Sequence, residues 1–233
     1  MTLKLFEVGG ADDAFRPSPY CWRTRMALAH KGLAFEPVPW RAVEKDRIAR
    51  SGGGIVPVLV DGDFWLNESW DIAVHLETAY PDRPSLFDGD GDRAKARFLD
   101  AWITGTVHGL IFRAVVRDQV PLLAEKDQAY YRERTLRKFG LSLDDIGADP
   151  DTAVEELDRV LAPLQSVLDE VPYLGGSRPT YGDYIVFGAF QWARVASRRK
   201  LYADDSPVAR WFARLLAAFD GFAAAQPGRD HWE

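Results

Sequence analysis

The sequence has few of the residues from which covalent or metal frameworks are built. Its 233 residues include one cysteine, Cys21, so an intramolecular disulfide is excluded. The four histidines are far apart, and no group of Cys and His residues has the spacing of a zinc site. We therefore expect neither a disulfide-stapled protein nor a protein-held metal.

Long apolar runs and an excess of basic charge are also missing. No run approaches the roughly 20 apolar residues that cross a bilayer, and the N-terminal stretch lacks the charged and apolar regions of a secretion signal. The formal net charge of −6 gives no general attraction to nucleic acid or anionic lipid. The Arg-rich stretches 132–138 and 194–200 are interpreted as solvated helix faces. These absences predict a cytoplasmic protein that binds neither nucleic acid nor membranes.

The chain has ample apolar content for a packed core, at 47% hydrophobic residues. Its first third alternates strand and helix patterns. We expect strands or helices, in order, at residues 3–8 (strand), 19–31 (helix), 35–40 (strand), 41–50 (short helix), 56–60 and 64–66 (hairpin) and 69–79 (helix). Pro37 and Pro39 remove two donors from the second strand, which favours an edge position.

Composition changes after residue 80. Residues 81–91 are rich in Pro, Gly and Asp with little periodicity, which indicates a linker. Helical patterns follow at residues 92–117, 126–139, 152–170, 181–197 and 207–219. The first of these helices is expected to bury Phe98, Trp102, Val107, Leu110 and Ala114. The predicted organisation is an α/β domain over residues 1–80, a linker over 81–91 and an all-helical domain over 92–233.

The stretch Ser18-Pro19-Tyr20-Cys21 lies where a strand leads into the first helix. Ser18 can cap that helix, and Pro19 at the first helical position loses no hydrogen bond. A hydroxyl group beside a helix N-terminus is also an environment that stabilises a bound thiolate. Cys21 falls inside the helix, where we interpret it as a small buried hydrophobe.

The motifs together carry a family resemblance. Two βα units, a hairpin and a helix follow the order of the thioredoxin-like fold, and an all-helical half comes after them. The motifs are Ser18-Pro19-Tyr20, Val56-Pro57, Glu68-Ser69, Tyr173-Leu174-Gly175-Gly176 and Thr180-Tyr181-Gly182-Asp183. With these in order, the chain resembles the cytosolic glutathione transferases over essentially its whole length. Residues 18–25 and 67–87 are most similar to the β-etherase and fungal-specific A group of that family.

The resemblance implies a glutathione site in the N-terminal half. Family members place a Ser, Tyr or Cys near position 18 to donate a hydrogen bond to the glutathione sulfur, while the alternative is that Ser18 only caps its helix. The resemblance also implies a cis bond between Val56 and Pro57, although most X-Pro bonds are trans. The Val56 backbone would then pair with the cysteinyl part of glutathione as a short antiparallel ladder.

The charged ends of glutathione need partners as well. The helix that begins after Glu68 offers its N-terminus, including Ser69, to the γ-glutamyl carboxylate, with Glu68 near the α-ammonium group. Plain helix-start chemistry is the alternative for this pair. The glycyl carboxylate needs a cation, and both Arg41 and Lys45 are candidates.

A hydrophobic, electrophilic second substrate is expected against the helix at residues 92–117. The candidate residues are Tyr20, Trp102, His108, Phe112 and Arg113. Aromatic residues at such spacing are most often core, so some of the five are expected to be buried and structural. Tyr20, His108 and Arg113 are the candidates for assisting a departing oxygen.

The resemblance implies a transferase activity. Glutathione thiolate, held by Ser18, would attack an aromatic electrophile by conjugation or by β-aryl ether cleavage. One alternative is a non-catalytic module that binds ligands or partner proteins. Another is a glutathione-dependent thioltransferase, against which Ser18 argues because a hydroxyl cannot form a mixed disulfide. The family habit also implies a homodimer.

Overall fold

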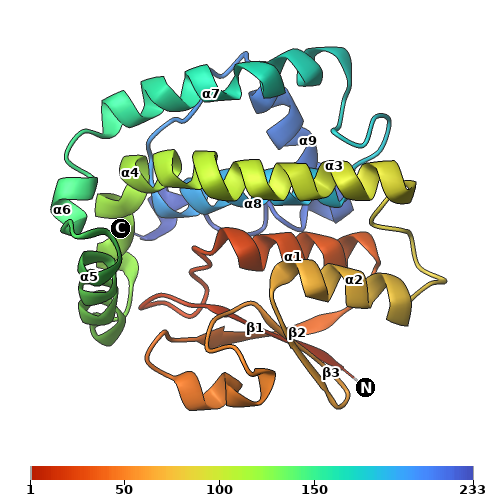
Figure 1. Cartoon of the computed structure of the whole chain (residues 1–233), viewed down its shortest axis with the longest axis horizontal. Helices are drawn as coiled ribbons and strands as arrows, with labels where there is room; N and C mark the ends of the chain where they lie inside the picture. Colours follow the sequence, from red (N-terminus) through yellow and green to blue (C-terminus); the bar gives the residue numbers. More distant parts are fainter. Residues whose placement is uncertain (1, 233) are drawn as a thin grey trace.

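The computed structural model describes residues 2–232. Its N-terminal part is a four-stranded sheet flanked by helices, and its C-terminal part is entirely helical (Figure 1). The two parts share one continuous core, because Leu5 and Ile72 of the first belong to the same buried cluster as Leu99 and Ile185 of the second. This is the predicted architecture of a thioredoxin-like domain joined to an all-α domain.

The sheet has the strand order β2-β1-β3-β4. The strands are β1 Leu3–Val8, β2 Phe35–Trp40, β3 Val58–Asp61 and β4 Phe64–Asn67. β1 and β2 are parallel, whereas β3 runs antiparallel to both β1 and β4. β2 is an edge strand, as its two prolines predicted.

The register brings three chain segments to one edge of the sheet. Phe6 of β1 lies opposite Val58 of β3, and Val58 lies opposite Asn67 of β4. The end of β1, the start of β3 and the end of β4 therefore meet at the same edge. The helix starts that follow β1 and β4 lie at this edge too.

Helices α1 Pro19–His30 and α2 Ser69–Ala79 lie between the sheet and the helical half (Figure 1). Trp22, Met26 and Ala27 of α1 are buried in the main core. On the other side of the sheet, the 3-10 helix η1 Lys45–Ser51 packs Ile48 against Phe6. This helix is shorter than the segment 41–50 predicted from the sequence, since residues 41–44 form a turn instead.

The helical half begins with one long helix. Its parts are α3 Gly89–Trp102, the π-helical segment η2 Ile103–Val107 and α4 His108–Gln119. The helix starts inside the segment expected to be a linker. The expectation that Phe98 is buried is wrong, since 68% of this residue is exposed. Val107 and Ala114 are buried as expected, and Leu99, Ile103 and Ile111 are further buried positions.

Four of the remaining helices match predicted segments to within two residues at each end, and three short helical segments were not predicted. They are η3 Val120–Leu122, α5 Glu125–Phe139, α6 Leu143–Ile146, α7 Pro150–Glu170, α8 Tyr181–Ala196, α9 Pro207–Gly221 and η4 Arg229–Trp232. Residues 218–220 within α9 leave helical geometry. None of the helices described is long and apolar enough to cross a membrane.

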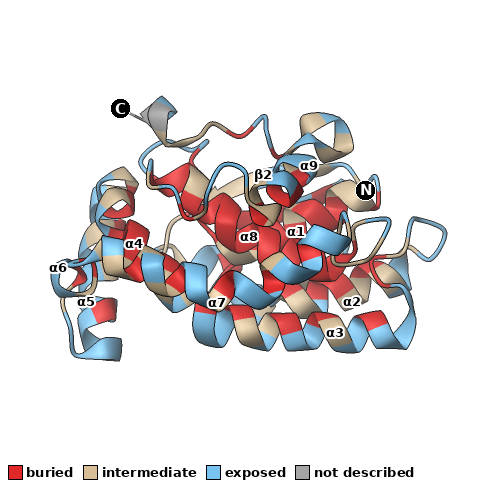
Figure 2. Cartoon of the chain, turned by 90° about the horizontal axis from the view of Figure 1, so that it is seen from above, coloured by how far each residue is buried: buried red, intermediate tan, exposed pale blue. Residues whose placement is uncertain are grey.

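Helix α8 is the buried centre of the helical half and packs against α1 (Figure 2). Its start is held by a capping box between Thr180 and Asp183. Asp183 also accepts hydrogen bonds from the backbone of Leu174 and Gly175 and from Trp211 Nε1, all within 3.1 Å. Burial raises the pKa of Asp183, and these donors stabilise its charged form.

Candidate functional site

Ser18 lies at the N-terminus of α1, at the sheet edge where β1 ends. Its backbone is extended and its Oγ accepts a hydrogen bond from Cys21 N at 3.3 Å, so Ser18 is the N-cap residue. The approach to the helix is fixed by Trp22 Nε1, which donates to Arg16 O at 2.9 Å. Ser18 is 9% exposed, and its hydroxyl hydrogen is left to donate to a bound acceptor.

Cys21 is buried one turn into α1 and packs with Phe6, Val56 and Val58. Burial, with a smaller contribution from the nearby charge of Glu7, raises the pKa of its thiol to about 12. Cys21 therefore stays a neutral thiol at physiological pH, in keeping with its interpretation as a hydrophobe. Any reactive thiolate at this helix must come from a bound molecule.

The peptide bond between Val56 and Pro57 is cis, as the family resemblance implied. The Val56 N-H and C=O make no backbone hydrogen bond within the part of the chain that the structure describes. Both groups lie at the start of β3, at the same sheet edge as Ser18. They are available to a peptide-like ligand laid along this edge.

Glu68 and Ser69 form the start of α2 at the same edge. Glu68 is exposed and has a positive φ of 66°, which a non-glycine residue adopts only when its surroundings enforce it. Ser69 is buried, and its carbonyl accepts a 2.6 Å hydrogen bond from Tyr181 OH on α8. The helical half thus fixes the position of the α2 N-terminus, whose first N-H groups are free to bind an anion.

The two candidates for binding the glycyl carboxylate, Arg41 and Lys45, make different contacts. Arg41 pairs with Asp13 at 2.5 Å and lies against Gly9, so it holds the loop between β1 and α1. Lys45 donates to Gly54 O at 2.6 Å, two residues before Val56. The Lys45 ammonium group therefore lies next to the exposed backbone of the cis segment.

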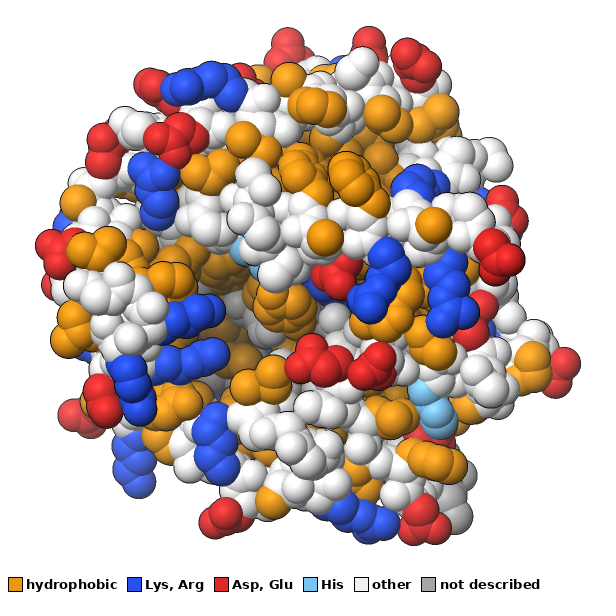
Figure 3. Space-filling view, in the orientation of Figure 1, with side chains coloured by type: hydrophobic (Ala, Val, Ile, Leu, Met, Phe, Trp, Pro, Cys, Tyr) orange, Lys and Arg blue, Asp and Glu red, His pale blue; other side chains and the backbone are white. Residues whose placement is uncertain are grey.

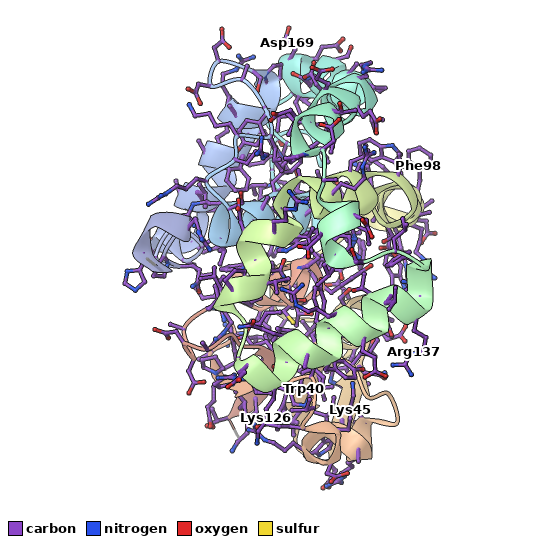
Figure 4. The ribbon with its side chains drawn as sticks, turned by 90° about the vertical axis from the view of Figure 1, so that its left-hand side faces the viewer. Trp40, Lys45, Phe98, Lys126, Arg137 and Asp169 are labelled. Carbon is purple, nitrogen blue, oxygen red and sulfur yellow. The ribbon has the colours of Figure 1, made fainter. Side chains whose placement is uncertain are left out.

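Helix α5 crosses over this part of the N-terminal half, with Trp40 and Lys45 beneath it (Figure 4). Lys45 Nζ lies 5.3 Å from the ring centre of Tyr130, and Val43 N donates to Asp127 Oδ1 at 3.3 Å. A deep hollow lies between α4, α5 and the N-terminal half, with an apolar interior and basic side chains along one rim (Figure 3). The molecule therefore has a cleft between its two halves.

Three of the predicted second-substrate residues come together. The ring centre of Tyr20 is 5.2 Å from that of His108, and His108 is 6.0 Å from Trp192. Phe112 stacks on Trp192 at 6.5 Å and also contacts Tyr131. An aromatic group built from α1, α4, α5 and α8 thus extends from the first turn of α1.

The other two predicted residues lie outside this group. Trp102 is half-buried and packs against the main core. Arg113 forms an ion pair with Glu156 of α7. Within the described part of the chain, neither makes a ring or cation-π contact with Tyr20, His108 or Phe112.

Comparison with known proteins agrees with this geometry. The profile described as "Glutathione S-transferase, N-terminal domain" matches residues 17–79, and that described as "Glutathione S-transferase, C-terminal domain" matches residues 94–219. The second match alone spans more than half of the chain. The protein belongs to the glutathione S-transferase family.

Several relatives cover nearly the whole transferase. Glutathione S-transferase 4 of Zea mays is 27% identical over 205 residues, which are 86% of this chain and 84% of the relative. The structure of glutathione transferase GSTFuA3 from Phanerochaete chrysosporium has a TM-score of 0.80 at 22% identity, covering 95% and 97% of the two chains. A Ceriporiopsis subvermispora glutathione S-transferase, solved in complex with glutathione, has a TM-score of 0.77 at 19% identity, covering 95% and 98%.

His108 is the polar member of the aromatic group in this transferase. Burial, with a smaller contribution from the nearby charge of Arg23, lowers its pKa to about 3. Its ring is therefore neutral at physiological pH, and its buried Nε2 has no hydrogen-bond partner within the described residues. A neutral imidazole can exchange hydrogen bonds with a substrate oxygen but carries no excess proton to transfer.

Sequence reasoning missed several residues that contact the predicted second-substrate residues. Trp192 and Tyr131 complete the aromatic group, and Arg23 stacks over Tyr20 at 4.6 Å while pairing with Asp100 at 2.5 Å. The only sequence signal for Arg23 was its place on α1, one turn after Tyr20. Among the described residues, no cluster of His, Cys, Asp and Glu is arranged to hold a metal ion.

Proposed function

We propose that this protein is a glutathione transferase in which Ser18 stabilises the glutathione thiolate for attack on an aromatic electrophile. The observation that carries the proposal is the single sheet edge that holds Ser18, the cis Val56-Pro57 bond and the start of α2 at Ser69. These elements offer a thiolate donor, a peptide-pairing backbone and an anion site in the order in which glutathione presents its groups.

The ends of glutathione are assigned from the same geometry. The γ-glutamyl carboxylate binds the free N-H groups at Ser69, and the exposed Glu68 carboxylate receives the α-ammonium group. Lys45 binds the glycyl carboxylate, since its ammonium group lies beside Gly54. Arg41 contributes charge from further away while it holds Asp13.

Ser18 and the N-terminus of α1 can supply the free energy needed to lower the pKa of the glutathione thiol. Lowering a thiol pKa from about 8.5 by about 2 units requires roughly 2.7 kcal/mol of preferential thiolate stabilisation. A hydrogen bond to a charged group contributes about 1.5–3 kcal/mol, and a helix N-terminus about 0.3–1 kcal/mol. Ser18 and the start of α1 together therefore suffice, and Ser18 does not need to act as a nucleophile.

The second substrate binds against Tyr20, His108 and Phe112. The thiolate attacks a carbon of the aromatic substrate, the carbon–halogen or carbon–oxygen bond breaks, and the departing group takes the electron pair. A departing oxygen is a poor leaving group, and Tyr20 or the neutral His108 ring donates a hydrogen bond to it. Arg113 is less suited to this role because Glu156 holds it.

The proposed substrates include β-aryl ethers. The likeness to the fungal transferases and the residues 18–25 and 67–87 support assignment to the β-etherase and fungal-specific A group, with β-aryl ethers as substrates. A thioltransferase activity is disfavoured, since position 18 is Ser and Cys21 is a buried neutral thiol.

The test is isothermal titration with glutathione, followed by turnover assays with aryl halides, β-aryl ethers and disulfides. We expect glutathione binding and product formation with the first two classes. Ser69→Ala should weaken glutathione binding several-fold. No binding at millimolar glutathione would overturn the proposal, and binding without turnover of any electrophile would support a ligand-binding module instead.

A further inference from the structure

The ammonium group of Lys45 is held by groups from three parts of the chain. Its Nζ lies 5.0 Å from the ring centre of Trp40 on β2 and 5.3 Å from that of Tyr130 on α5. It also donates a 2.6 Å hydrogen bond to Gly54 O, in the loop before the cis bond. Lys45 is therefore a point of contact between the two halves of the protein.

The charge of Lys45 is not neutralised by the protein. The residue is half-buried, and no carboxylate in the described part of the chain lies within ion-pair distance of it. The faces of the two aromatic rings attract the cation without cancelling its formal charge. The Gly54 carbonyl is neutral as well. An anion that binds beside Gly54 thus meets a cation whose position is already fixed.

Trp40 and Tyr130 differ in what holds them in place. Trp40 is 3% exposed and its Nε1 donates to Glu44 O at 2.8 Å, so this ring is fixed within the N-terminal half. Tyr130 belongs to α5, which crosses over Trp40 and Lys45 (Figure 4). The position of the Tyr130 ring therefore depends on how α5 is attached to the N-terminal half.

Asp127 attaches α5 to the turn that precedes Lys45. This residue is 4% exposed, and Val43 N donates to its Oδ1 at 3.3 Å. Asp127 and Tyr130 are three residues apart, so they lie on one face of α5. Tyr131, the next residue, contacts the aromatic group of the cleft. A short stretch of α5 thus contacts both the Lys45 segment and the second-substrate residues.

We propose that Tyr130 is a positioning residue for glutathione, an inference that rests on the proposed transferase function. Together with Trp40, its ring holds the Lys45 ammonium group beside Gly54, where the glycyl carboxylate binds. Because this group is placed before glutathione arrives, less side-chain entropy is lost on binding. Tyr130 acts through Lys45, so it favours ligands that carry the glycyl carboxylate.

The experiment compares glutathione with its glycyl ethyl ester, in which the carboxylate is neutral, by isothermal titration. Tyr130→Leu should weaken glutathione binding about threefold to tenfold and change ester binding by less than about twofold. Tyr130→Phe keeps the ring and should bind both ligands as wild type does. In turnover assays, Tyr130→Leu should raise KM for glutathione and leave kcat unchanged, because the lost interaction does not involve the reacting sulfur.

The matched control is Leu136→Ala, which changes no charge on the same helix. The Leu136 side chain belongs to a residue that is 54% exposed, and the variant should bind both ligands as wild type does. Thermal unfolding midpoints confirm that each variant is folded.

Two results would overturn the proposal. One is an equal loss of affinity for glutathione and for its ester in Tyr130→Leu, which would indicate a general role in the fold. The other is wild-type glutathione affinity in a folded Tyr130→Leu. The same titrations separate this inference from the transferase function. A wild type that binds neither ligand contradicts both, whereas glutathione binding that Tyr130→Leu leaves unchanged contradicts the positioning role alone.

Discussion

The hydroxyl of Tyr181, in the first turn of α8, donates a 2.6 Å hydrogen bond to the backbone carbonyl of Ser69 at the start of α2. The two residues come from different halves of the protein, 112 positions apart. The ring of Tyr181 packs against the rings of Trp70 and Phe87. The most buried helix of the C-terminal half therefore positions the N-terminus at which the γ-glutamyl group is proposed to bind.

Removal of this hydroxyl should affect both stability and binding. Tyr181→Phe loses one buried hydrogen bond, so the free energy of unfolding should fall by about 1 kcal/mol. Glutathione affinity should fall severalfold, because the start of α2 is less firmly placed. Tyr80→Phe is the matched control, since its hydroxyl bonds to Asp61 elsewhere. Equal glutathione affinities in the two variants would contradict the positioning role of Tyr181.

Ser18→Ala should raise the pKa of the bound glutathione thiol and lower turnover about tenfold to a thousandfold without abolishing it. The reason is that the variant loses the hydroxyl donor but keeps the helix N-terminus. Thiolate absorbance across a pH series measures the first effect. Ser18→Cys should gain activity with disulfides. An unchanged thiol pKa together with full activity in Ser18→Ala would show that another group activates the sulfur.

Glu68 offers a test that separates backbone strain from charge. At its φ of 66°, glycine is favoured over alanine because it has no Cβ. Glu68→Gly should therefore be more stable to urea than Glu68→Ala by about 1 kcal/mol. Both variants lack the carboxylate, and both should bind glutathione more weakly than wild type by a similar factor. Equal unfolding midpoints for the two variants would argue that the positive φ is not enforced.

Stability should decline as the pH falls from neutrality. Burial lowers the pKa of His108 to about 3 and that of His30 to about 4, below the ordinary value of 6.5. Below pH 6.5 the unfolded chain binds protons at these sites that the folded chain does not. Their contribution to stability is thus complete above pH 6.5 and is lost as the pH falls to about 4 for His30 and about 3 for His108. Urea unfolding of His108→Gln and His30→Gln should show a shallower decline than wild type, and parallel curves would refute this.

The expected homodimer can be examined through the exposed aromatic residues. Phe98 on α3 and Phe64 on the β3–β4 hairpin are 68% and 61% exposed. Contact surfaces are marked by contiguous apolar patches, and these are the two most exposed large apolar side chains of the described residues. We expect light scattering to give twice the monomer mass of 26.2 kDa, and Phe98→Asp to shift this toward the monomer. A monomeric wild type at assay concentration would refute the dimer.

Local chemistry explains which features could be predicted from the sequence. The Ser18 cap, the edge position of Pro37 and the Thr180–Asp183 capping box each depend on residues a few positions apart. Such features are determined by backbone sterics and short-range hydrogen bonds. The ordered motifs of the family then located the cis Val56-Pro57 bond, which no local rule predicts.

Long-range packing explains what could not be predicted. The burial of Leu99 in place of Phe98 depends on where α3 contacts α8 and not on the apolar character of either residue. Trp192 comes beside His108 only because α8 crosses α4. Arg113 has the spacing of a cleft residue, but Glu156 from α7 holds it. No pattern within a single helix contains these relationships.

The π-helical segment Ile103–Val107 sets the rotational phase of everything after it in the long helix. A π turn accommodates one more residue than an α turn, so the side chains of α4 lie about 100° behind the positions in which a regular helix would place them. With this change of phase, His108 contacts Tyr20 and Phe112 contacts Trp192. Consequently, closure of this segment into regular α-helix with the same number of residues would rotate both rings out of register with α1 while leaving every side chain of the cleft chemically intact.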